Sequence, residues 1–204
     1  DNQPINFSVP TGNFGDVYAG YLAKKLGLPI NKLIVATNQN DILHRAISKG
    51  KYEAEHVSET ISPSMDIQIA SNFERLIYDL NNHDSSQTLD DMKNIKQNGK
   101  YTIDDEKLKK INQDFLSARM SEQETLDVIK NIYEKFNMVL DPHTAIGYGA
   151  FDKHDLKGNN IVLATAHPCK FPDAILKAIN LKSDLPNELK FILDEKENYG
   201  IIEN

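Results

Sequence analysis

Residues 5–16 read INFSVPTGNFGD. The first five of these residues favour extended backbone, so a short strand is expected over 5–9. Gly12 and Gly15 then mark a turn, and apolar side chains at helical spacing predict a helix over 16–26. A strand, a glycine turn and a helix in this order form the first half of a βαβ unit, in which the next strand runs parallel to the first.

The same alternation returns along the chain. The apolar run over 33–36 predicts a buried strand, and the helix that follows can be capped by Asn40 and ended by Gly50. A further strong strand is expected over 160–164, before a helix that begins at Pro172. Strands separated by helices indicate the α/β class, with a parallel sheet.

The middle of the chain is predicted to be mainly helical. The tetrapeptides SNFE at 71–74 and SEQE at 121–124 have the S-x-x-E form of a capping box, in which two side chains satisfy free N–H groups at the start of a helix. Residues 81–101 are polar and fit a solvated loop or a flexible helix. The next amphipathic helix is expected to present an apolar stripe of Leu108, Ile111 and Phe115. We therefore expect residues 81–137 to be a mainly helical insertion on one side of the sheet.

Composition excludes several classes of protein. The chain has 204 residues, of which 23 are basic and 30 acidic, so its formal net charge is −7. A pI near 5.4 argues against a nucleic-acid-binding protein, which needs a basic face. No run approaches the roughly 18 apolar residues of a membrane span. The single cysteine, Cys169, excludes an intramolecular disulfide framework and favours the reducing cytoplasm.

The beginning of the chain is unusual. Residue 1 is Asp rather than Met, and the first expected strand starts only four residues later. The first residues also lack the charged and apolar pattern of a secretory leader. We therefore expect the sequence to be an excised part of a longer cytoplasmic protein.

The glycine turn is the first candidate binding site, because ligands of parallel sheets bind beyond the carboxyl ends of the strands. Glycine permits positive φ angles, which let successive N–H groups converge, and the following helix adds free N–H donors. The stretch 11–16 could therefore hold a phosphate. The glycine pattern by itself nevertheless favours a plain strand-to-helix turn, in which Asp16 lies at the positive end of the helix dipole. The spacing of Gly12 and Gly15 matches neither the dinucleotide nor the Walker glycine motif.

The second candidate site follows the strand at 160–164. Thr165 can offer a hydroxyl at the end of that strand, although a β-branched residue there is also ordinary strand composition. His167 could act as a base or be an exposed turn residue. The six histidines show no metal-binding spacing, and Cys169 has no sign of activation. Lys170 could pair with an anion or be solvated.

Several ordered blocks of the sequence resemble the threonine synthase family. They are SVPTGNFGD at 8–16, SPSMDIQ at 62–68, SNFER at 71–75, DPHTA at 141–145 and TAHPCKFP at 165–172. These blocks spread along nearly the whole chain, and only the region 81–137 matches loosely. We therefore identify the chain as a member of this family.

The resemblance implies a fold-type II pyridoxal-phosphate (PLP) enzyme. Residues 1–204 would form the C-terminal part of its PLP-binding catalytic domain, an incomplete three-layer parallel-sheet domain. The enzyme would convert O-phospho-L-homoserine and water into L-threonine and phosphate, and the chain would have neither nucleic acid nor membrane as a partner. The residues implied to bind the cofactor are Gly12, Asn13, Phe14, Gly15, Asp16 and, near the ring nitrogen, Thr165.

The family's Schiff-base lysine lies upstream of the glycine turn, so no lysine of this chain is given that role. The 204 residues are accordingly expected to be inactive by themselves. Candidates for binding the substrate's phosphate are Arg75, His143 and Lys170. Three alternatives remain open: a related fold-type II phospho-lyase, a non-catalytic phosphate-binding module, and an interaction protein that uses the helices over 104–136.

Overall fold

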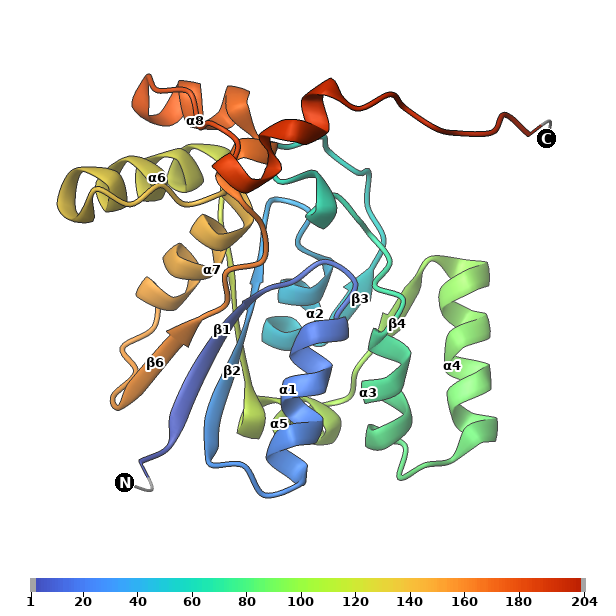
Figure 1. The fold of residues 1–204 in the computed structure, drawn as a ribbon. Helices are drawn as coiled ribbons and strands as arrows, with labels where there is room; N and C mark the ends of the chain where they lie inside the picture. Colours follow the sequence, from blue (N-terminus) through green and yellow to red (C-terminus); the bar gives the residue numbers. More distant parts are fainter. Residues whose placement is uncertain (1–2, 203–204) are drawn as a thin grey trace.

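The protein is an α/β fold built on a four-stranded parallel sheet (Figure 1). The structure, a computed structural model, describes residues 3–202. The strands are ordered β5-β2-β1-β6, and all three pairings are parallel, as the alternation of strands and helices predicts. Their bounds are Ile5–Pro10 for β1, Ile30–Thr37 for β2, Phe115–Arg119 for β5 and Asn159–Val162 for β6.

Helices cover both faces of the sheet, which gives three layers (Figure 1). Strand β2 shows the two faces, because its side chains alternate between them. Leu33 and Val35 enter a core that includes residues of α1, α2 and α3, whereas Ile34 packs against Ile146 of α7. The helices on the first side are α1 (Gly15–Lys25), α2 (Ile42–Lys49), α3 (Phe73–Leu80) and α5 (Asp105–Asp114), and those on the second are α6 (Glu122–Phe136), α7 (Pro142–Asp152) and α8 (Pro172–Ile179).

Smaller elements surround these layers. Helix α4 (Ser85–Asn98) packs on α3, at the outer side of the molecule in Figure 1. A separate antiparallel pair joins β3 (Lys51–Glu53) to β4 (Lys100–Thr102). Short 3-10 helices are η1 (Pro63–Met65), η2 (Pro168–Lys170) and η3 (Asn187–Asp194).

Helix α7, whose sequence is rich in Ala and Gly, approaches the sheet closely through its small residues. A Cβ atom added at Gly147 would lie 3.0 Å from Cγ of Pro10, and one at Gly149 would lie 2.2 Å from Cε of Met120. The hydroxyl of Ser8 on β1 donates to the carbonyl of Gly147 at 2.5 Å. Close contact at Gly147 places the start of α7 next to the carboxyl end of β1.

Two predicted helix starts are wrong. Helix α3 has Asn72, not Ser71, at its N-cap position, because the N–H of Asn72 donates to the carbonyl of Asn13 and fixes the chain one residue later. Helix α2 has Asp41 at its N-cap position, since the side chain of Asn40 is instead bonded to the segment around Ser58. In both cases a tertiary contact outweighs the local preference for a cap.

The segment 81–137 is richer in strands than predicted. Its polar first part is the helix α4, which agrees with one of the two alternatives. Phe115, however, is not part of an amphipathic helix but opens β5, where it pairs with Leu33. Its ring is 1% exposed and packs on the ring of Phe14. The segment therefore supplies an edge strand of the main sheet as well as helices.

Residues 3–202 contain neither a membrane-spanning helix nor a cluster of metal-binding side chains. No helix in that range combines the length and the apolar character needed to cross a bilayer. In the same range, no three His, Cys, Asp or Glu side chains are grouped so that they could hold a metal ion.

The capping box of α6 has the predicted form. The hydroxyl of Ser121 accepts from the N–H of Glu124 at 3.3 Å, and the Glu124 carboxylate accepts from the N–H of Ser121 at 2.7 Å. Lys153 adds a hydrogen bond of 2.6 Å to the other carboxylate oxygen. The bonds from Lys153 and from Ser121 lower the pKa of Glu124 from 4.5 to about 2.

We expect Glu124→Gln to make stability less sensitive to acid. Because the pKa of Glu124 is lowered in the folded state, its contribution is present above about pH 4.5 and is lost as the pH falls towards 2. Urea unfolding from pH 6 to pH 2 should show a loss of about 1 kcal/mol for the variant at pH 6, and little at the lowest pH. Glu134→Gln, at the exposed end of the same helix, is the control. Equal pH profiles for the wild type and the Glu124 variant would contradict this prediction.

Candidate functional site

The turn between β1 and α1 is fixed by Phe14. This residue is the N-cap of α1 and has a left-handed backbone, with φ of 71°. Its side chain is 0% exposed, and its ring packs edge-on against Phe73 at 5.1 Å and on Phe115 at 5.7 Å between centroids. A bulky residue rarely adopts this conformation, so burial of the ring stabilises a strained turn.

The two glycines of the turn serve a different purpose from the one predicted. Among residues 11–16 the left-handed conformation belongs to Phe14, and the glycines instead allow close approach. A Cβ at Gly12 would lie 2.6 Å from the carbonyl oxygen of Ser64, and one at Gly15 would lie 3.1 Å from Nδ2 of Asn72. The side chain of Asn13 accepts from the N–H of Gly15 at 3.2 Å. The turn thus packs closely against the segments around Ser64 and Asn72.

The segment that covers Gly12 is held at the end of β2 by a polar network. The Asp66 carboxylate accepts from the side-chain amides of Asn38 at 2.7 Å and Asn40 at 3.0 Å. It also accepts from the N–H of Thr60 at 2.8 Å and from the hydroxyl of the same residue at 2.6 Å. Because Asn38 and Asn40 are buried, these bonds satisfy groups that water does not reach. The network fixes Ser64 and Met65 above the glycine turn.

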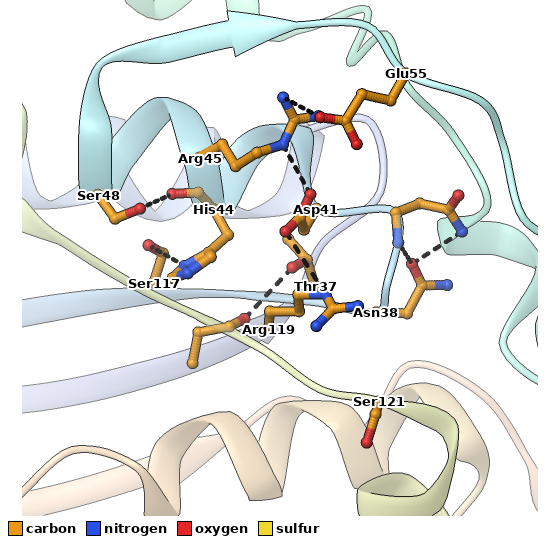
Figure 2. Close-up of polar contacts among 12 residues, drawn as sticks. Thr37, Asn38, Asp41, His44, Arg45, Ser48, Glu55, Ser117, Arg119 and Ser121 are labelled. Atoms are coloured by element: carbon orange, nitrogen blue, oxygen red, sulfur yellow. Dashed lines mark hydrogen bonds and ion pairs between the residues drawn. The ribbon is translucent and has the colours of Figure 1, made fainter.

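Ion pairs continue this network into α2. Figure 2 shows Asp41 between Arg45, at 2.8 Å, and Arg119, at 3.6 Å. The same view shows His44 on α2 with Nδ1 2.9 Å from the hydroxyl of Ser117 on β5. Burial lowers the pKa of His44. These contacts join the start of α2 to the edge strand.

The opposite part of the site is built at the start of α7. Asp141, 1% exposed, is the N-cap and accepts from the N–H of His143 at 2.9 Å and from the hydroxyl of Thr144. Burial raises the pKa of Asp141, but the hydrogen bonds from His143 and Thr144 outweigh it and hold the pKa below its usual range. The Thr144 oxygen also accepts from the N–H of Thr165 at 3.3 Å. This chain of bonds ties Thr165 to α7.

These parts enclose a cavity of about 250 Å³. All six residues expected to contact a cofactor line it, although they come from sequence positions about 150 apart. The lining also contains two of the three candidates for a second anion, His143 and Lys170. The third, Arg75, lies on a separate cavity with Tyr18 and Tyr78. The full lining is Pro10, Thr11, Gly12, Asn13, Phe14, Gly15, Asp16, Ser64, Met65, His143, Thr165, Ala166 and Lys170.

Ser64 and Met65 are lining residues that reasoning from the residues alone did not identify. The sequence marks 62–64 as a loop, and only the family resemblance drew attention to the block around them. Their place above Gly12 depends on the network at Asp66, which joins residues more than 20 positions apart. No local pattern predicts such a contact.

The cavity fits a phosphorylated ligand. The first N–H groups of a helix lack partners within it, and the first two residues of α1, Gly15 and Asp16, line the cavity. Gly12 and Gly15 keep the backbone free of side chains at this point, and the Asp16 side chain is exposed to solvent. Lys170 adds a positive charge. N–H donors at a helix start together with a lysine are an anion-binding arrangement.

Comparisons of the sequence and of the structure with known proteins all match threonine synthases. A family model described as "Threonine synthase, C-terminal" matches residues 144–204. The chain is 40% identical to threonine synthase from Pseudomonas aeruginosa over 206 residues, and 42% identical to that from Saccharomyces cerevisiae over 229 residues. A crystal structure of PLP-bound threonine synthase from Brucella melitensis matches 98% of the chain, with 44% identity and a TM-score of 0.93.

The matched relatives are longer than this chain. The alignments cover 100% of the chain but 44% of the Pseudomonas protein and 45% of the yeast protein. The structural match covers 43% of the Brucella chain. The chain therefore spans less than half the length of the relatives that it matches.

We expect Gly12→Ala to destabilise the protein, because the new Cβ would lie 2.6 Å from the carbonyl oxygen of Ser64. That oxygen belongs to the backbone, so the clash cannot be relieved by rotation of a side chain. Forced overpacking of this kind costs about 1–3 kcal/mol. Urea unfolding should show that loss. Gly200→Ala is the control, since no atom among the described residues lies within 4 Å of its added Cβ. Unfolding curves that coincide for the two variants would rule out this role of Gly12.

Proposed function

Because this chain belongs to the threonine synthase family, we propose that the protein converts O-phospho-L-homoserine and water into L-threonine and phosphate with PLP. The observation that carries the proposal is the single cavity shared by the glycine turn and Thr165. Residues 1–204 would supply the C-terminal part of the PLP-binding catalytic domain. The single cysteine favours a cytoplasmic protein.

The cofactor's phosphate would bind the turn of Gly12, Asn13, Phe14, Gly15 and Asp16. The buried ring of Phe14 keeps this turn rigid, so its N–H groups are in position before the ligand arrives. Ligand binding then costs little conformational entropy. The Asn13 side chain bonds the N–H of Gly15 and would keep the turn in its binding shape.

Thr165 would contact the ring nitrogen of the cofactor. When bound, PLP withdraws electrons from the carbon atoms of the substrate next to its amino group. A hydroxyl at the ring nitrogen, in place of a carboxylate, leaves that nitrogen largely neutral and moderates this withdrawal. The bond from the N–H of Thr165 to Thr144 would hold the hydroxyl at a fixed height in the cavity.

The Schiff-base lysine of the family is expected N-terminal to the glycine turn, outside residues 1–204. Proton transfer at the substrate carbon depends on that lysine. We therefore propose that the 204 residues by themselves do not turn over the substrate. Release of threonine by the isolated chain would contradict this.

The decisive experiment uses the protein of full natural length with PLP and O-phospho-L-homoserine. Released phosphate and threonine should form in equal amounts. Phosphate together with a 2-oxo acid and ammonia would indicate a related phospho-lyase instead. Bound PLP without turnover would leave a phosphate-binding module.

We expect Asn13→Trp to weaken the retention of PLP about tenfold, a change of about 1.4 kcal/mol. The indole would crowd the turn and remove the bond to the N–H of Gly15. The measurement is PLP absorbance per protein after dialysis. Asn94→Trp on the exposed face of α4 is the control. Equal PLP content in both variants would remove the turn from the proposed site.

A further inference from the structure

Thr165 lies just beyond the part of the chain that the sheet holds. After β6, the N–H of Leu163 still donates to the carbonyl of Ser8 on β1, at 3.0 Å. In a parallel pair every second residue of a strand donates to its neighbour, so the N–H of Thr165 would come next. That N–H donates instead to the hydroxyl oxygen of Thr144 on α7, at 3.3 Å. Helix α7 thus takes over from the sheet at Thr165.

Burial does not hold Thr165 in place of the sheet. Both Ala164 and Thr165 are exposed, and Thr165 lines the cavity. A segment with little buried apolar surface opens easily unless hydrogen bonds hold it. Thr144, in contrast, is 6% exposed and belongs to the helix that packs on Pro10 through Gly147. The bond between the two threonines therefore joins an exposed part of the cavity wall to a helix that is fixed on the sheet.

Asp141 decides in which direction the hydroxyl of Thr144 points. This hydroxyl forms a hydrogen bond with Oδ2 of Asp141, and an ionised carboxylate only accepts. Burial raises the pKa of Asp141, but the hydrogen bonds from His143 and Thr144 outweigh it, so the carboxylate is ionised at neutral pH. The hydroxyl proton of Thr144 is thereby committed to Asp141, and a lone pair of its oxygen remains for the N–H of Thr165.

The first turns of two other helices show that this orientation is not a general feature of helix starts. Thr88 of α4 donates its hydroxyl to the backbone carbonyl of the N-cap residue Asp84, at 2.7 Å. Thr125 of α6 bonds in the same way to its N-cap residue, at 2.8 Å. Thr144 donates to the side chain of its N-cap residue and accepts from a residue 21 positions away. Its hydroxyl therefore serves the cavity wall as well as its own helix.

We propose that Thr144 is a positioning residue for the cofactor, which holds Thr165 at the ring nitrogen and is itself oriented by Asp141. Without the oxygen of Thr144, the N–H of Thr165 has no partner on α7, and the hydroxyl contact to the ring nitrogen weakens. The start of α7 thereby controls how strongly the bound cofactor withdraws electrons. This inference rests on the proposed function, because it takes Thr165 as the contact of the ring nitrogen.

The first test measures hydrogen exchange of the Thr165 amide in the protein of full natural length, before PLP is added. The amide should be protected in the wild type. Protection should fall about tenfold in Thr144→Val, which keeps the shape but lacks the acceptor, and Thr144→Ser should restore it. Thr125→Val also removes a buried hydroxyl and is the control, with unchanged protection at Thr165. Exchange of the wild-type amide at the rate of an unstructured peptide would overturn the inference without any variant.

The second test adds PLP to the wild type and the same variants. Thr144→Val should shift the absorption maximum of bound PLP and bind PLP about tenfold more weakly, as expected on losing one hydrogen bond. Thr144→Ser and Thr125→Val should match the wild type. An unchanged absorption maximum in Thr144→Val, with only lower stability to urea, would refute the inference. The proposed function would then still stand if the wild type turns over the substrate. Failure of the wild type to bind PLP would overturn both.

Discussion

Insertion of the Phe14 side chain into the core is the interaction on which the rest of the site depends. The ring sits among Phe73 of α3 and Phe115 of β5, and it keeps a left-handed backbone at the start of α1. Burial of a large apolar ring contributes about 1.5–3 kcal/mol, which is of the same order as the strain of a single left-handed residue and offsets it. Helix α1 and the glycine turn are therefore fixed relative to the sheet, and the first residues of α1, Gly15 and Asp16, line the cavity.

Around this fixed turn, the half-buried carboxylate of Asp66 and the buried carboxylate of Asp141 set the remaining walls. Asp66 collects the amides of Asn38 and Asn40 and brings Ser64 over Gly12. Asp141 collects the N–H groups and side chains at the start of α7 and ties Thr165 into place through Thr144. A buried carboxylate is tolerated only when such bonds replace its water shell. Each network thus replaces water that its carboxylate has lost on folding, and it brings distant segments together.

The strands β1, β2 and β6 and the helices that follow them could be predicted because they follow from local periodicity and from glycine and proline positions. The errors occurred where a residue satisfied two patterns at once. Phe115 continues the helical spacing of Leu108 and Ile111, but it also begins a strand whose backbone pairs with β2. Asn40 is a good cap by type, yet its amide bonds the segment around Ser58. The tertiary hydrogen bonds are preferred because they satisfy buried groups, whereas water can satisfy the free N–H groups of an exposed helix start.

The α/β class and, through the ordered motifs, the family could be inferred from the amino-acid sequence alone, whereas the anion site at the glycine turn stays a prediction. Each of these depends on neighbouring residues or on a pattern along the chain. Folding had to bring distant segments together before it was evident that Gly12 serves close packing and not a left-handed turn, that Ser64 lies above it, and that Thr165 lines the same cavity as the turn. These features arise from contacts between segments about 50 to 150 residues apart, and packing of a folded core, not local preference, selects such contacts.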